Sequence, residues 1–246
     1  SVVHEVKRLS SEGVREFNLI AQDSSFYGRD LNDGTTLARL LKELVKIDNV
    51  KWIRLFYLYP TYFDDELLEI ITKEEKICKY VDIPLQHISD SVLRRMHRRD
   101  SSQSIKKLLK KLRNTTPYIT IRTTLMVGFP GETEADFKEL LTFIKAVKFD
   151  NMGAFTYSAQ DGTPAARMVD QVTEEIKENR YHELMAAQAE ISEENNRNLI
   201  GVDTEVLVEE LLDDGCGNLQ AKGRASFQAP EVDGNVYIDH PGDLRP

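Results

Sequence analysis

Cysteine and histidine are both scarce in this chain. Among its 246 residues, the only cysteines are Cys78 and Cys216. Two cysteines so far apart form neither a disulfide framework nor a pair of metal ligands. The five histidines are scattered at positions 4, 87, 97, 182 and 240, and no two have the spacing typical of a zinc site. The sequence therefore predicts no metal site built from its own residues.

Long apolar runs and excess positive charge are missing as well. No apolar run reaches the ~20 residues that a membrane helix needs, and no basic-then-apolar signal segment opens the chain. We therefore expect a cytoplasmic protein with no membrane partner. The 32 lysines and arginines are outnumbered by 41 aspartates and glutamates, which gives a net charge of −9. Such a balance disfavours tight nonspecific binding of nucleic acid, unless a basic patch is segregated on one face.

A strand followed by a helix is the pattern that recurs along the first two thirds of the chain. This alternation is typical of an α/β protein with a parallel sheet and right-handed crossovers. An open doubly wound sheet and a barrel both fit the pattern. Polar loops after the strands fit a barrel-like arrangement with ligands at the carboxyl ends. The expected strands are residues 16–21, 51–57, 80–83, 118–127 and 151–157.

The last third of the chain has a different pattern. Residues 172–199 form a long charged stretch without glycine or proline, which predicts a helix. A coiled coil is possible, but a strap packed on the preceding domain fits its short apolar seam better. Short alternating segments after Gly201 predict a small all-β module. We expect the barrel in residues 1–171, the connecting helix in 172–200 and the β module in 201–246.

The segment Tyr118–Glu134 is the most informative part of the sequence. It reads as a buried strand, then a turn containing Gly128 and Gly131, then a helix whose N-cap is Thr133. Glycines at the carboxyl edge of a parallel sheet let a ligand lie against the backbone. The alternative is a strand–helix connection that needs glycine for its geometry alone.

Other polar residues follow the predicted strands. Gln22 and Asp23 suit binding of an amino or carboxylate group, although an Asx-type turn that starts a loop is the simpler explanation. His87 is placed to act as a base or a hydrogen-bond donor. Arg122 interrupts an apolar strand and needs a partner, either a carboxylate ligand or a neighbouring strand. The basic run in residues 94–99 fits a solvated helix face or an anionic ligand.

Several longer motifs resemble one enzyme family. The segments AQDSSFYGRD, YVDIPLQHISDSVLRRMHRR, TTLMVGFPGETEADF and GRASFQAPEVDGNVYID are similar to the methylthiotransferases, which are radical S-adenosylmethionine (SAM) enzymes. The resemblance covers nearly the whole chain. It implies a partial barrel of the radical SAM type followed by a TRAM domain, a small oligomer-binding-like β module.

The resemblance also implies cofactors and a substrate. In the family, SAM is cleaved by a four-iron–four-sulfur cluster held by a C-x-x-x-C-x-x-C loop, and a second cluster serves sulfur insertion. This sequence has no such loop. We therefore expect the carboxyl-terminal part of an enzyme, lacking the amino-terminal domain, the first strand and the cluster loop, and holding neither cluster.

Two branches of the family differ in substrate. One modifies an adenosine of transfer RNA, and the other modifies the β-carbon of an aspartate in small-subunit ribosomal protein S-twelve. The motifs QDSSFYG, IPLQH and APEVDG resemble the ribosomal-protein branch. From Gly201 onward ten acidic residues face three basic ones, which would repel RNA and attract a basic protein. A non-catalytic ribosome-binding module is the alternative of another class.

The resemblance assigns site residues by motif. The catalytic residues stay unassigned. The residues expected to bind SAM are Gln22, Gln86, Arg122, Gly128, Phe129, Gly131, Glu132 and Tyr157. The residues expected to dock the basic substrate protein are Glu209, Glu210, Asp213 and Asp214.

Overall fold

The structure is a computed structural model that describes residues 1–116, 118–213, 219–239 and 244. Within them, five parallel strands form one sheet in the order β1-β2-β3-β4-β5, and three antiparallel strands form a second, smaller sheet. The larger sheet contains β1 (Glu16–Leu19), β2 (Trp52–Leu55), β3 (Ile77–Asp82), β4 (Thr120–Val127) and β5 (Asn151–Thr156). The expected α/β fold with a parallel sheet is confirmed. β3 begins three residues earlier than the sequence pattern indicated.

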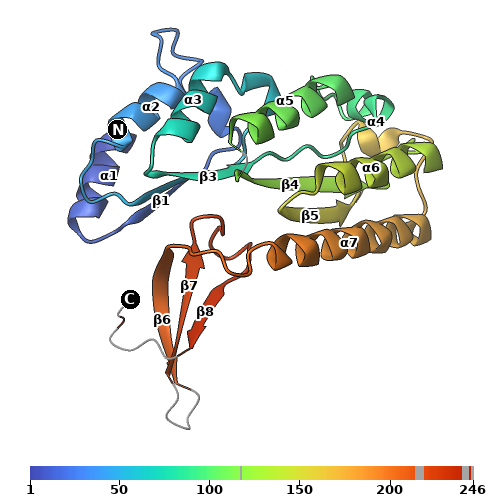
Figure 1. Cartoon of the computed structure of the whole chain (residues 1–246). Coiled ribbons are helices and arrows are strands. Elements are labelled where there is room, and N and C mark those ends of the chain that lie inside the picture. The colour runs from blue at the N-terminus through green and yellow to red at the C-terminus, as the bar shows by residue number, and fades with distance from the viewer. Residues whose placement is uncertain (117, 214–218, 240–243, 245–246) are drawn as a thin grey trace.

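Helices cover one face of the parallel sheet (Figure 1). They are α1 (Val2–Ser11), α2 (Leu37–Leu44), α3 (Asp65–Lys73), α4 (Asp90–Arg95), α5 (Ser102–Thr115) and α6 (Glu134–Val147). Short 3₁₀ turns lie at Ser24–Phe26, Pro60–Tyr62 and Ala165–Arg167. Because the strands follow one another in chain order with these helices on one side, the sheet is a partial barrel rather than a doubly wound sheet.

The main core lies between these helices and the sheet. Leu41, Ile53, Ile71, Ile121 and Leu140 are among its fully buried side chains. In strands, alternate side chains point to opposite faces, so the same strands also present an inner face. A second cluster covers part of that inner face and contains Trp52, Phe56, Cys78 and Tyr80 together with Ala229 of the final module.

The last helix, α7 (Glu174–Arg197), packs against α6 and β5. Leu184, Ala187 and Ile191 are its buried apolar side chains, so it is a strap on the sheet domain, as the sequence favoured, and not a coiled coil. The chain then enters the antiparallel sheet of β6 (Val206–Asp213), β7 (Leu219–Ala225) and β8 (Val236–Asp239). This module lies on the side of the parallel sheet opposite α1–α6 (Figure 1).

Candidate functional site

A cavity of about 510 Å³ opens at the carboxyl ends of β3, β4 and β5. Its apolar wall includes Met126, Phe129 and Phe155, and its polar side includes Gln86 and Arg98. A volume between about 300 and 1,000 Å³, with mostly apolar walls and a few polar groups, is typical of a small-molecule site. The carboxyl edge of the sheet is therefore the candidate site, as the sequence predicted.

Gln86 has an unusual backbone conformation in this cavity. Its φ is +67°, a region that residues other than glycine rarely adopt. Two hydrogen bonds hold it there: its N–H donates to the Thr124 carbonyl at 2.9 Å, and its carbonyl accepts from the Met126 N–H at 2.7 Å. The Gln86 Oε1 atom is buried and has no hydrogen-bond partner among the described residues. An amide oxygen held in this way is ready to accept a hydrogen bond from a ligand.

Two arginines form the cationic side of the cavity. Arg95 pairs with Asp170 at 2.7 Å. Arg98 donates to the Pro84 carbonyl, and its guanidinium carbon lies 4.4 Å from the centre of the Tyr59 ring. Both belong to the basic run for which the sequence left an anionic ligand open. Their place in the cavity wall favours that alternative.

The glycine turn after β4 is built differently from the sequence expectation. Gly128 and Gly131 have φ values of +74° and +81°, so glycine is required. Their N–H groups already donate, Gly128 to Glu132 Oε2 at 2.7 Å and Gly131 to the Asp170 carbonyl at 2.8 Å. An added Cβ would collide with Lys177 at Gly128 and with Arg95 at Gly131. Protein groups therefore occupy the space that a Cβ would fill at both glycines, and the assignment of Gly128 and Gly131 to SAM stays a prediction.

Glu132 also points inward. It is buried and accepts a hydrogen bond from Arg180 of α7 at 2.9 Å. Burial raises the pKa of its carboxyl, while Arg180 and the turn N–H groups oppose the shift. His87 Nε2 lies 3.8 Å from the same carboxylate. These contacts hold the turn in one conformation.

Tyr157 supports the cavity wall at Phe129 in a second layer. Its ring packs edge-on against Phe129, with 5.2 Å between ring centres. Its hydroxyl is buried and has no hydrogen-bond partner among the described residues. The Lys177 ammonium lies 5.4 Å from the ring centre. Tyr157 thus orders Phe129, and the structure places it behind the cavity rather than in its lining.

Gln22 and Arg122 lie outside the cavity lining. Gln22 is exposed after β1, and the neighbouring Asp23 accepts from the Ser25 N–H at 3.0 Å, which is the Asx-type turn. Arg122 donates to Asp233 of the final module at 2.7 Å. Its partners are therefore carboxylates of the chain itself, because Asp82 of the neighbouring strand β3 lies 3.9 Å from the Arg122 Nε atom as well. Their assignment to SAM stays a prediction.

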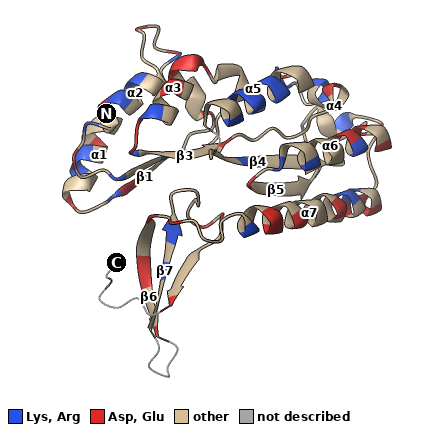
Figure 2. Ribbon diagram, in the orientation of Figure 1, with Lys and Arg blue, Asp and Glu red and all other residues tan. Residues whose placement is uncertain are grey.

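The expected docking residues of the final module differ in their surroundings. Glu209 forms an ion pair with Arg224 at 2.5 Å, and Glu210 lies 3.8 Å from Lys222. Asp213 is exposed, and Asp214 lies outside the described residues. Acidic residues of β6 are seen in Figure 2. Glu209 is thus already engaged within the chain.

Family models match most of this chain. The model of the radical SAM superfamily matches residues 1–144, and that of the TRAM domain matches residues 200–245. The chain belongs to the radical SAM superfamily. The small antiparallel sheet is consistent with the TRAM match, and the cavity lies where this superfamily's barrel would hold a ligand by the carboxyl-edge rule.

Several curated relatives of this radical SAM chain share one name. Proteins named ribosomal protein uS12 methylthiotransferase RimO from Pelobacter propionicus and Citrifermentans bemidjiense are each 51% identical to 97% of it. The chain spans about half the length of these relatives, 52% and 53%. The resemblance to the methylthiotransferases is confirmed.

A solved structure shares the fold. The coproporphyrinogen III oxidase HemN from Escherichia coli, described as a radical SAM enzyme, aligns with a TM-score of 0.59 over 77% of this chain and 45% of its own. At 16% identity this likeness concerns the fold alone. No helix among the described residues has the length and apolar character needed to cross a membrane.

Some residues of the cavity lining could be predicted from the sequence, and others could not. Gln86 and Phe129 were assigned from motifs, and both line it. Met96, Phe155 and Met168 also line it and were missed. Methionines and a strand phenylalanine look like ordinary core residues in sequence. Only the alternation of β5, which puts Phe155 on the inner face, carried a usable signal.

Proposed function

We propose that this chain is the carboxyl-terminal part of an enzyme that methylthiolates the β-carbon of an aspartate in ribosomal protein uS12. The identity of about half of all residues to proteins named for that activity, over nearly the whole chain, carries the proposal. In this assignment residues 1–171 supply the cavity, 172–200 the strap and 201–246 the substrate-facing module. We propose a cytoplasmic location, because the substrate is a ribosomal protein.

The cavity suits SAM in size and chemistry. Phe129, Phe155 and Met126 offer flat apolar contacts to an adenosyl group. The free Gln86 Oε1 suits the methionine ammonium, and Arg98 suits the methionine carboxylate. In the radical SAM family, bound SAM is the source of the radical that takes a hydrogen atom from the substrate. The residues of this chain would orient SAM and exclude water.

The iron–sulfur clusters do not fit the residues described here. Within the described part of the chain, no three histidine, cysteine or acidic side chains come together as a metal site. Cys78 is buried, and burial raises the pKa of its thiol to about 11, so it is not a ready thiolate ligand. We propose that both clusters belong to the rest of the full-length enzyme. Iron and sulfide assays after anaerobic reconstitution of this chain test that assignment.

SAM binding tests the cavity assignment directly. Replacing Gln86 with leucine removes the acceptor but keeps the volume, so the dissociation constant for SAM should rise about tenfold, the loss of one charged hydrogen bond. Equilibrium dialysis with labelled SAM measures it. Gln103→Leu, an exposed position on α5, is the matched control and should bind as the parent does. Equal affinity in the parent and in Gln86→Leu would contradict the assignment.

A further inference from the structure

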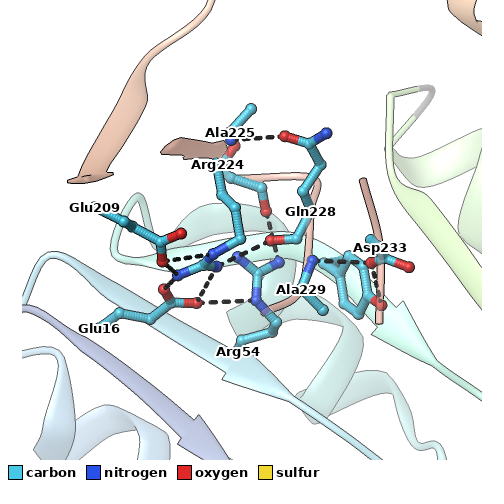
Figure 3. A network of polar contacts seen from close by, with 10 residues as sticks. Glu16, Arg54, Glu209, Arg224, Ala225, Gln228, Ala229 and Asp233 are labelled. Carbon is cyan, nitrogen blue, oxygen red and sulfur yellow. Dashed lines mark hydrogen bonds and ion pairs between the residues drawn. The ribbon is translucent and has the colours of Figure 1, made fainter. Parts of the chain in front are cut away.

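The final module inserts a loop into the inner face of the parallel sheet. The loop joins β7 to β8, and its Ala229 is fully buried among Trp52, Phe56, Cys78 and Tyr80. Figure 3 shows the loop and its polar contacts from close by. An interface between domains of one chain is usually polar and lets the domains move. This interface combines buried charges with an apolar contact, in which the loop residue Ala229 packs among side chains of the sheet and acts as a plug.

One set of buried charges lies at the β1–β2 side of the plug. Glu16 of β1 accepts from Arg54 of β2 at 3.1 Å and from Arg224 of β7 at 2.6 Å. Arg224 also pairs with Glu209 at 2.5 Å, so two carboxylates balance two guanidinium groups. Arg54 has no exposed surface, and it donates to the Ser226 carbonyl at 2.7 Å. Separating the module from the sheet would leave Glu16 without Arg224 and Arg54 without the Ser226 carbonyl.

A second set lies at the β3–β4 side and centres on Asp233. Its Oδ1 accepts from Arg122 at 2.7 Å, and its Oδ2 accepts from the Tyr80 hydroxyl and from the Ala229 N–H, each at 2.8 Å. The Asp233 side chain is 1% exposed. A buried carboxylate satisfied by three donors from the loop and from two strands fixes all of them in one geometry.

The Asp233 contacts lie directly beneath the candidate cavity. Arg122 and Met126 are four residues apart on β4, so their side chains point to the same face of the sheet. Met126 lines the cavity, while Arg122 holds the loop. Between them is Thr124, whose carbonyl fixes the backbone of Gln86. The strand that carries the loop's anchor therefore also carries the cavity wall.

We propose that the loop between β7 and β8 is the fixed floor of the barrel interior and that Asp233 is a positioning residue. Through Arg122 it holds β4, and with it the wall around Gln86 and Met126. The module is then a part of the cavity and not a tethered appendage. A substrate protein bound to the module would therefore be held in a fixed position relative to the cavity. The identity of the cavity ligand rests on the proposed function, whereas the closed floor does not.

Cys78 reports whether the floor is closed, because Ala229 covers it. In a Cys216→Ser background, the rate at which a thiol reagent labels Cys78 measures opening. Asp233→Asn removes the charge that holds Arg122, so labelling should accelerate about tenfold, the loss of one charged hydrogen bond. Asp239→Asn, the same change on β8, where the carboxylate accepts a hydrogen bond from Gln220, should label at the parent rate.

A separate variant controls for faster Cys78 labelling that is caused by a general loss of stability. Leu109→Ala removes a buried side chain of α5, far from the loop and on the helix-covered face. Compared at temperatures equally far below their melting temperatures, Asp233→Asn should still label faster than Leu109→Ala. Equal labelling of the two variants would overturn the closed floor.

SAM affinity shows whether Asp233 positions the cavity wall or only stabilises the fold. Asp233→Asn should weaken SAM binding by at least about fivefold, while Leu109→Ala at a matched distance from melting should bind as the parent does. Faster labelling of Asp233→Asn with the parent's SAM affinity would overturn the positioning role. If the parent itself binds no SAM, the proposed function fails and the Cys78 labelling alone decides on the floor.

Discussion

His87 lies fully buried behind the glycine turn, and its two ring nitrogens meet different surroundings. Nδ1 accepts a hydrogen bond from the Ser89 N–H at 3.0 Å. Nε2 has no hydrogen-bond partner among the described residues. Burial lowers the pKa of the imidazole from 6.5 to about 4, and the nearby Arg180 adds to the shift, while Asp136 opposes it. The histidine is therefore neutral and structural at pH 7, and the sequence-based suggestion of a base has no support from its position.

His87 should make the stability of this chain depend on pH. Its folded pKa lies below its unfolded value, so the stabilisation is fully present above pH 6.5 and is lost as the pH falls toward 4. Between pH 7 and 5.5 the loss should be about 1 kcal/mol. Urea unfolding followed by the fluorescence of Trp52 measures it.

His87→Asn is the matched variant, because its Oδ1 can still accept from Ser89. It should be less stable at pH 7, and the gap to the parent should narrow at pH 5.5. A gap of constant size at both pH values would show that His87 does not titrate in this way.

The connection from β4 to α6 shows what an element-level pattern can and cannot predict. The sequence predicted the strand, the turn and the N-cap at Thr133. The structure has all three, with Thr133 and Asp136 forming a reciprocal capping box. The sequence did not reveal that Lys177, Asp170 and Arg180 of the later chain fill the turn from outside. Those contacts cross more than thirty residues and leave no periodic signal in the segment itself.

Gly131→Val should therefore act first on folding. The side chain would adopt a strained φ of +81° and collide with Arg95, which together should cost about 3 kcal/mol or more. Gly201→Val is the control, because Gly201 has the same φ and open space around its Cβ position; it should lose only the backbone part. Melting curves compare the two. If a ligand instead lies against the Gly131 backbone, SAM affinity should fall more than stability, and equal melting of both variants would favour that alternative.

At the scale of the whole molecule, local patterns predicted the layers but not how the two sheets meet. Strand–helix alternation is encoded within each segment, so the parallel sheet and the β module could be predicted. The contacts of Arg224 with Glu16 and of Asp233 with Arg122 join residues more than a hundred positions apart. The motif APEVDG was recognised as a family feature, and the structure shows that it is the plug containing Ala229 and Asp233. The motif packs against the inner face of the parallel sheet, and a single sequence does not show which residues of the other sheet it contacts.

The acidic module should steer a basic protein toward the cavity. Glu209 is left intact in the test, because it holds Arg224. Amide replacements of the other three expected docking residues should slow association with uS12 about tenfold at low salt, and high salt should abolish the difference. Stopped-flow or surface-binding kinetics with the full-length enzyme measure it. The replaced residues are Glu210, Asp213 and Asp214.

Three exposed glutamates of α7 provide the matched control for these charge changes. Neutralising these three glutamates changes the net charge equally but leaves the module untouched, so association should slow much less. If both sets slow association equally, net charge rather than a docking face explains the effect. The control residues are Glu175, Glu183 and Glu190.

The mass of uS12 after incubation with the full-length enzyme, SAM, a sulfur source and a reductant tests the proposed methylthiolation. The account predicts that one aspartate of uS12 exchanges a β-hydrogen for a methylthio group, and that Gln86→Leu reduces the yield at limiting SAM. Transfer RNA included in the same reaction should stay unmodified. A methylthio group on an adenosine of the transfer RNA with none on uS12, or no modification of either, would contradict it.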